Sequence, residues 1–216
     1  TTGPLLHDAI FTGEIYDARK DLGHWNRESY DDNIWESALQ VRPPTGTLMF
    51  QTIPFNKVMQ IVDTHFEQLN DSLYIFTLPE TVSGWCTLNV EGNSGDMIRL
   101  RFISEEGLDY GQTDTYILKG GDKEEWEPKF TWHTFRKVEV VSRNTKISES
   151  SLIVKSIFTD VKNTGSFECS NELFNRICQA YNRTMHANFK GIVSSDPHRE
   201  RLAYTCLLYT SPSPRD

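Results

Sequence analysis

The stretch TLNVEGNSGDMIRLRF, residues 87–102, decides the fold class of this chain of 216 residues. Apolar residues alternate with polar neighbours on both sides of a central GNSG segment; they are Leu88, Val90, Ile98, Leu100 and Phe102. A period of two is typical of strands that bury one face. The GNSG segment supplies turn residues. We therefore predict a β-hairpin with one buried face.

Further short strands are expected on both sides of this hairpin, separated by turn residues. They are predicted at 59–66, 73–78, 115–118, 129–141 and 152–158. Almost no helical period occurs between residues 48 and 162, so two packed sheets in an antiparallel β-sandwich are the simplest architecture. The segment VRPPTGT, residues 41–47, holds two prolines and a glycine and marks the best domain boundary.

A helix is predicted after the NTG segment at residues 163–165. Apolar residues there recur at spacings of three and four, which indicates one helix face; they are Leu173, Phe174, Ile177, Cys178, Tyr181 and Met185. Ser170 is placed to cap the first turn. Gly191 is expected to end the helix.

Composition excludes several classes of function. The net charge of −8 disfavours a nucleic-acid partner, and no apolar run approaches the roughly 20 residues that span a bilayer. None of the four cysteines forms a CxxC pair and no histidine completes a zinc pattern. We expect no metal, no cofactor, no disulfide framework and no membrane partner, with most of the five tryptophans in the core.

Both ends of the sequence point to a piece of a longer protein. The chain begins without Met or a secretion-signal pattern, so the compartment cannot be inferred from it. The last eleven residues, CLLYTSPSPRD at 206–216, match the translation of a transposon-type sequencing adapter in one reading frame. We expect this tail to be an artefact that replaces the natural sequence after Thr205.

Three segments together resemble bacterial α-L-rhamnosidases of glycoside hydrolase family 78. They are GEIYDAR at 13–19, the run from SGWCTLNV to FRKVEV at 83–140, and FECSNELF to RLAYT at 167–205. The resemblance implies the end of an N-terminal β-domain at 1–42, a concanavalin-like accessory domain at 43–162 and the beginning of an (α/α)6 catalytic barrel at 163–205. The implied fold is mainly β, with an antiparallel β-sandwich followed by the first helix and loop of a truncated barrel.

The third segment carries the implied site. The family's loop reads close to DCPQRERLGWTGD, and the residues on this pattern are Pro197, Arg199, Glu200, Arg201, Leu202 and Thr205. The resemblance implies Glu200 as the catalytic acid, with Asp196, Arg199 and Tyr204 binding substrate. Ser195 aligns with the family's leading Asp unless Asp196 substitutes for it, Tyr204 stands where Trp is common, and the following Gly-Asp is absent.

Two interpretations of DPHRER at residues 196–201 stay open. An inverting glycosidase needs one carboxyl group to protonate the leaving oxygen and another to activate water. Glu200 would need a raised pKa for the first role, and Asp196 could supply a negative charge for this if the loop is helical. From spacing alone, the favoured interpretation is a solvated charged turn that begins a helix, with Asp196 as its cap. The resemblance reverses this preference for Glu200, and less so for Arg199 and Asp196.

The expected activity is hydrolysis of terminal α-L-rhamnosyl residues from plant polysaccharides or glycosides, without a cofactor. A rhamnose-containing carbohydrate is therefore the expected partner. The 216-residue chain itself is expected to be inactive. The resemblance implies a periplasmic or secreted parent, because rhamnosidases of this layout are often exported. The alternatives are a non-catalytic carbohydrate-binding β-sandwich and a related (α/α)6 glycosidase with a different sugar specificity.

Overall fold

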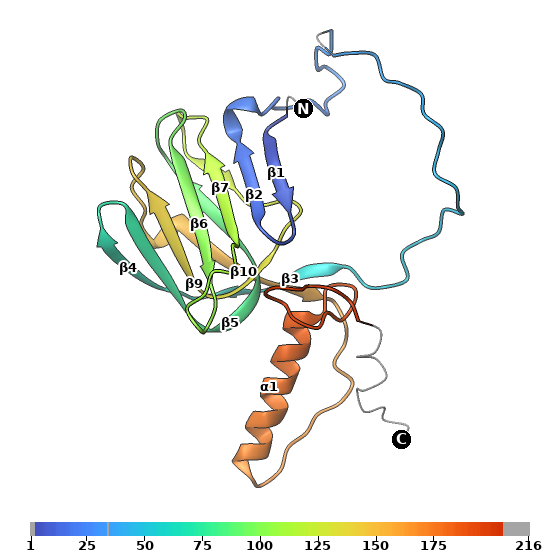
Figure 1. Ribbon diagram of the computed structural model, residues 1–216, viewed down its shortest axis with the longest axis vertical. Helices are drawn as coiled ribbons and strands as arrows, with labels where there is room; N and C mark the ends of the chain where they lie inside the picture. The colour runs from blue at the N-terminus through green and yellow to red at the C-terminus, as the bar shows by residue number, and fades with distance from the viewer. Residues whose placement is uncertain (1–2, 34, 205–216) are drawn as a thin grey trace.

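The computed structural model describes residues 3–33 and 35–204, which form a curled sheet and one long helix (Figure 1). Eight of the ten strands follow the hydrogen-bonded order β1-β2-β7-β6-β9-β5-β10-β3. The other two, β4 and β8, each pair with β5. The strands are β1 Leu5–Ala9, β2 Gly13–Asp17, β3 Asn56–Val62, β4 His65–Asn70, β5 Leu73–Val90, β6 Met97–Ile103, β7 Thr113–Ile117, β8 Glu124–Trp126, β9 His133–Ser142 and β10 Leu152–Thr159. The helix is α1, Glu172–Asn188.

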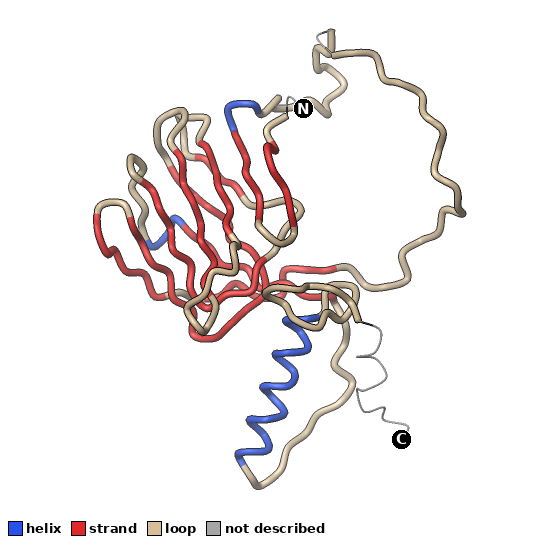
Figure 2. The backbone as a smooth tube through the Cα atoms, viewed as in Figure 1, coloured by secondary structure: helices blue, strands red, loops and turns tan. Residues whose placement is uncertain are grey.

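The predicted class, mainly β with one helix near the C-terminus, is confirmed (Figure 2). The two layers of the predicted sandwich belong to one continuous sheet that folds over on itself. All but one of its strand pairs are antiparallel, the exception being β2 with β7. Two short 3-10 helices, Ala18–Lys20 and Glu149–Ser151, lie in the connections.

The core lies inside the curl. Its largest fully buried apolar side chains are Phe76, Leu78, Leu88, Ile98, Leu100, Phe102, Leu118, Phe135 and Ile147. Burying a side chain of this size stabilises the fold by about 1.5–3 kcal/mol. Trp126 belongs to this core, but Trp25 and Trp35 are 55% and 45% exposed. Trp85 and Trp132 are half-buried, so the expectation that most of the tryptophans are core residues was wrong. Trp25 and Trp35 pack against each other in a loop.

The predicted hairpin at 87–102 was correct in its buried face and wrong in its pairing. The end of β5 pairs with β10 and β8, whereas β6 pairs with β7 and β9. Asp96 in the connecting segment accepts hydrogen bonds from Asn93 N at 2.9 Å and Asn144 Nδ2 at 2.9 Å. The bond from Asn144 joins the β5–β6 connection to the turn after β9, across 48 residues of sequence. The local alternation of apolar and polar residues does not indicate such a contact.

The strand predicted at 59–66 is divided in two. β3 ends at Val62 and pairs with β10, and β4 begins at His65 and pairs with β5. At the other edge, β2 lies parallel to β7, so residues 13–17 belong to the same sheet as the central strands. Between β2 and β3 along the chain, the described residues of 21–55 contain no strand or helix and arch away from the sheet (Figure 1). The domain boundaries stay a prediction.

Helix α1 begins one residue later than Ser170 would place it. Its N-cap is Asn171, whose Oδ1 accepts a hydrogen bond from Leu173 N at 3.0 Å, so the prediction of Ser170 as the cap was wrong. The helix ends at Asn188. Gly191, which has a φ of 85°, lies beyond the C-cap residue. Among the described residues, no helix is long and apolar enough to cross a membrane.

Candidate functional site

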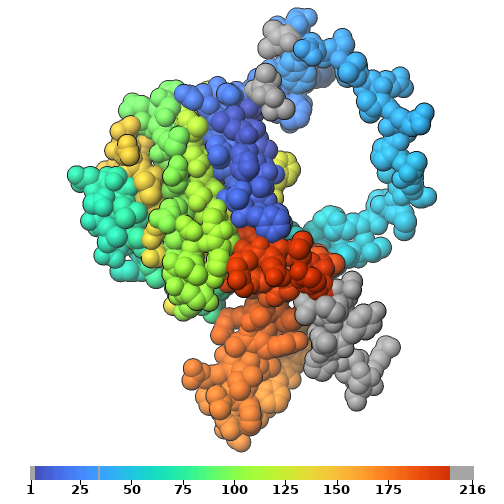
Figure 3. Space-filling view, in the orientation of Figure 1, coloured from blue at the N-terminus to red at the C-terminus, as the bar shows by residue number. Residues whose placement is uncertain are grey.

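The segment that carries Glu200 is a closed loop. A β-bridge joins Ser194 to Ala203, and inside it Ser195 N donates to Leu202 O at 3.1 Å. Residues 197–200 form a turn and not a helix. We call residues 194–203 the acidic loop. It lies between the lower end of the sheet and the helix α1, as the red residues in Figure 3 show.

Asp196 caps this turn. Its Oδ1 accepts hydrogen bonds from His198 N at 2.6 Å and Arg199 N at 2.9 Å. Burial raises the pKa of the Asp196 carboxyl, but these two N–H groups and the charges of His198 and Arg199 together lower it below its usual value. Asp196 is therefore an ionised acceptor at neutral pH. The helical geometry through which it would act on Glu200 is absent, because the intervening residues form a turn.

The other three predicted site residues reach solvent. Glu200 is exposed, and its Oε2 accepts a hydrogen bond from Ser195 Oγ at 3.0 Å. The Arg199 side chain is 65% exposed and its Nε lies 3.6 Å from Asp196 Oδ2. Tyr204 is 42% exposed. The structure thus brings Asp196, Arg199 and Glu200 together in one short turn, and their roles toward a sugar stay a prediction.

Residues that the sequence did not single out support the acidic loop from the β6–β7 connection. Gln112 is almost fully buried and its Nε2 donates to His198 O at 2.5 Å. The ring of Tyr110 lies 5.6 Å from the ring of His198 and 5.8 Å from the Arg199 guanidinium. Burial lowers the pKa of His198, and the opposing charges of Asp196 and Glu106 do not restore it.

Arg201 supports the loop from a second side. Its Nη1 donates to Ile10 O in the β1–β2 turn and to Trp132 O, the latter at 2.6 Å. Its guanidinium carbon lies 4.6 Å from the centre of the Trp132 ring. Burial lowers the pKa of Arg201 to about 10, partly offset by Asp114 and Asp196, so this side chain keeps its charge at neutral pH.

Lys190 adds a second cation to Trp132, with its Nζ 5.0 Å from the ring centre. The same Nζ donates to His186 O and Ala187 O, each at 3.1 Å, at the C-terminal end of α1. Burial, together with the charge of Arg201, lowers the pKa of Lys190 to about 7. Trp132 is therefore the side chain through which the sheet contacts both the helix end and the acidic loop.

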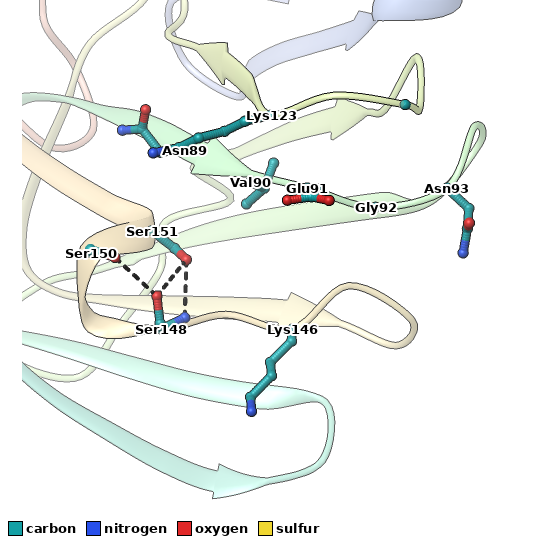
Figure 4. A pocket seen from close by; sticks show the side chains of 11 residues that line it. Asn89, Val90, Glu91, Gly92, Asn93, Lys123, Lys146, Ser148, Ser150 and Ser151 are labelled. Carbon is teal, nitrogen blue, oxygen red and sulfur yellow. Dashed lines mark hydrogen bonds between the residues drawn. The ribbon is translucent and has the colours of Figure 1, made fainter.

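Two sizeable pockets differ in their relation to this loop. A pocket of about 550 Å³ lies between β5, α1 and the acidic loop, and Pro197 and His198 line it. A pocket of about 600 Å³ lies at the opposite end of the sheet and is lined by Asn89, Val90, Glu91, Gly92, Asn93, Gly121, Lys123, Lys146, Ser148, Ser150 and Ser151 (Figure 4). None of the predicted site residues lines the second pocket, and no aromatic side chain does.

Within residues 3–33 and 35–204, no three His, Cys, Asp or Glu side chains gather as metal ligands. Cys86, Cys169 and Cys178 are free thiols. The acidic loop itself offers carboxylate, guanidinium and hydroxyl groups.

Comparison with known proteins gives three consecutive family matches. Residues 1–60 match the alpha-L-rhamnosidase N-terminal domain, residues 67–158 the bacterial alpha-L-rhamnosidase concanavalin-like domain, and residues 162–210 the bacterial alpha-L-rhamnosidase 6 hairpin glycosidase domain. The first match ends and the second begins close to β3 and β4.

Individual relatives agree with these matches. An alpha-L-rhamnosidase of Formosa agariphila is 32% identical over 94% of this chain and 23% of its own length. The solved alpha-L-rhamnosidase of Dictyoglumus thermophilum superposes with a TM-score of 0.85 at 31% identity, over 94% of this chain and 24% of that one. The Streptomyces avermitilis alpha-L-rhamnosidase complexed with L-rhamnose superposes with a TM-score of 0.81 at 28% identity, over 95% of this chain and 21% of that one.

The chain thus spans about a quarter of the length of these relatives. Its sheet, helix and acidic loop correspond to domains that follow one another in a single family. The chain belongs to the bacterial alpha-L-rhamnosidase family.

Proposed function

We propose that this chain is part of a glycoside hydrolase that removes terminal α-L-rhamnosyl residues from plant polysaccharides or glycosides, with Glu200 as its general acid. The observation that carries the proposal is the match of residues 162–210 to the 6 hairpin glycosidase domain, with an exposed carboxyl group at position 200 inside it. Relatives along nearly the whole chain bear the same activity in their names.

In this proposal Glu200 hands its proton to the leaving glycosidic oxygen, and a second carboxylate activates water on the opposite face of the sugar. The second carboxylate comes from the part of the hairpin domain beyond residue 205. The hydroxyl of Ser195 donates to Glu200 Oε2 at 3.0 Å and fixes the direction of the carboxyl group. Exposure leaves Glu200 able to meet a substrate that approaches from solvent.

Asp196, Arg199 and Tyr204 are proposed to bind the sugar. Asp196 has a lowered pKa and so accepts hydrogen bonds from sugar hydroxyls, and Arg199 donates them from an exposed guanidinium group. A rhamnose-containing carbohydrate is the substrate class, in keeping with the relative whose structure contains L-rhamnose. No cofactor takes part in this chemistry.

The test compares two proteins on p-nitrophenyl α-L-rhamnoside: this chain, and a longer protein in which residues 1–205 continue through a complete hairpin domain. We expect hydrolysis by the longer protein alone. Glu200→Gln in the longer protein should lower kcat by about 10²–10⁴, the usual contribution of a general acid. Glu125→Gln, an exposed carboxylate on β8, is the matched control and should keep full turnover.

Other outcomes favour the alternatives. Hydrolysis of a different p-nitrophenyl glycoside and not the rhamnoside would indicate another sugar specificity. The polar pocket of about 600 Å³ is the feature that favours a carbohydrate-binding sandwich. Calorimetric titration of this chain with rhamnose and rhamnogalacturonan oligosaccharides tests that function, and heat beyond dilution that Lys146→Ala abolishes would support it.

A further inference from the structure

We propose that Arg201 is a positioning residue: it docks the acidic loop on the β-sheet and thereby fixes the place from which Glu200 acts. The docking itself concerns this chain alone. Its catalytic consequence rests on the function proposed above.

The side chains of Glu200 and Arg201 go to opposite environments although they are neighbours in sequence. Glu200 is exposed, whereas Arg201 is only 8% exposed. Arg201 Nη1 donates to the carbonyl oxygens of Ile10 and Trp132, which belong to two different connections of the sheet. Hydrogen bonds from a charged donor are about twice as strong as neutral ones, and the contact with the Trp132 ring adds a cation–π attraction.

Backbone strain is concentrated at the same place. Arg201 has a φ of 47°, in the left-handed region that is unfavourable for a residue other than glycine. Among the described residues, the other non-glycine with positive φ is Tyr110, whose ring lies against His198 and Arg199. Such conformations persist where surrounding contacts hold them. One of these two residues lies in the acidic loop and the other in the β6–β7 connection that faces it, so the strain lies at the contact between the loop and the sheet.

The buried charge of Arg201 is also stabilised by a nearby carboxylate. Asp114 is fully buried, and its carboxylate raises the pKa of Arg201 against the effect of burial. Asp114 is itself fixed, since its Oδ1 accepts hydrogen bonds from Glu14 N and His133 Nε2, each at 2.9 Å. Among the described residues, Arg201 Nε and Nη2 are buried without a hydrogen-bond partner. The sheet therefore holds the guanidinium group through Nη1, the Trp132 ring and the charge of Asp114.

Arg199 provides a matched comparison. It has the same side chain, lies two residues away in the same loop and is 65% exposed, with its ion pair inside the loop. Its one contact with the sheet connections is the Tyr110 ring at 5.8 Å, and no hydrogen bond joins it to the sheet among the described residues. A surface pair of this kind contributes little to stability. Replacing Arg199 should therefore leave the loop docked, whereas replacing Arg201 should release it.

The first experiment measures amide hydrogen exchange in this chain. Two amides of the loop are hydrogen-bonded across it, Ser195 N to Leu202 O and Arg201 N to Asp196 O. We expect Arg201→Gln to speed their exchange by about tenfold or more, Arg201→Lys to do so less, and Arg199→Gln to change it little. Unchanged exchange of core amides such as Val138 shows that the variants are folded. Equal exchange in Arg201→Gln and wild type would overturn the docking.

The second experiment measures hydrolysis by the longer protein described above. Arg201→Gln should lower kcat by roughly 10–100-fold with little change in KM, because a small displacement of the acid slows proton transfer while the sugar still binds. Arg201→Lys should recover part of kcat. If the wild-type protein does not cleave the rhamnoside, the proposed function fails while the exchange result stands. If the wild type is active and Arg201→Gln keeps its kcat, the positioning role is refuted.

Discussion

Replacing Lys190 by Met should change how the stability of this chain depends on pH. The Lys190 ammonium lies against the Trp132 ring at the end of α1, and burial lowers its pKa from an ordinary value of 10.5 to about 7. Between these two values the unfolded chain binds one more proton at this position than the folded chain does. The stability of the wild type should therefore rise with pH across this window, and be lost as pH falls toward 7.

The size of the effect follows from the width of the window. A difference of 3.5 between the two pKa values corresponds to about 5 kcal/mol at 1.36 kcal/mol for each unit. Lys190 Nζ keeps two hydrogen bonds to carbonyl oxygens and part of its contact with solvent, so we expect about 2–3 kcal/mol in practice. Lys190→Met removes the titrating group and with it this part of the pH dependence.

The assay is urea unfolding of the wild type and Lys190→Met at pH 6.5 and pH 10. The wild type should gain about 2–3 kcal/mol relative to the variant over this interval. Lys119→Met, which removes an exposed lysine, is the control for the loss of one positive charge and should follow the wild type. The same pH dependence in Lys190→Met and wild type would refute the reasoning, because it would mean that Lys190 titrates alike in folded and unfolded chains.

Two further predictions concern the fold. A Cβ atom on residue 84 would lie 1.8 Å from the Lys155 carbonyl oxygen. Gly84→Ala should therefore push β5 away from β10 and lower the free energy of unfolding, measured by urea titration, by about 3 kcal/mol. Gly165→Ala is the control: a Cβ atom there meets nothing within 4 Å, so the free energy of unfolding should change by less than about 0.5 kcal/mol. Asn171→Ala should remove the cap of α1 at a cost of about 1 kcal/mol, seen as faster amide exchange in its first turn, and Ser170→Ala should leave that exchange unchanged.

The alternation of apolar residues predicted which side chains are buried far better than which strands pair. Leu88 and Phe102 are both in the core, as their pattern indicates. In the sheet, β9 lies between their strands, and the hydrogen bond from Asn144 to Asp96 joins the turn after β9 to the β5–β6 connection. A period of two records burial along one strand and contains no information about its neighbours. The helix cap shows the same limit at short range, since Ser170 and Asn171 are both good caps by residue type.

The candidate site was predictable in its carboxylates and not in its supports. Asp196 and Glu200 stand out by residue type and by likeness to a family motif. Arg199 and Arg201 are chemically identical in the sequence, and one is exposed while the other is buried. The difference arises from Trp132, which is 69 residues earlier than Arg201 and joins the loop only through the fold. No local pattern could have shown that contact.

The role of Glu200 as a proton donor is tested most directly by varying the leaving group. The longer protein and its Glu200→Gln variant are compared on a dinitrophenyl rhamnoside, whose departing oxygen needs almost no proton, and on an alkyl rhamnoside, whose oxygen needs one. We expect the variant to lose no more than about tenfold in kcat on the first substrate and about 10³-fold or more on the second. An equal loss on both substrates would contradict the assignment, because a donor of the leaving-group proton cannot be indifferent to the leaving group.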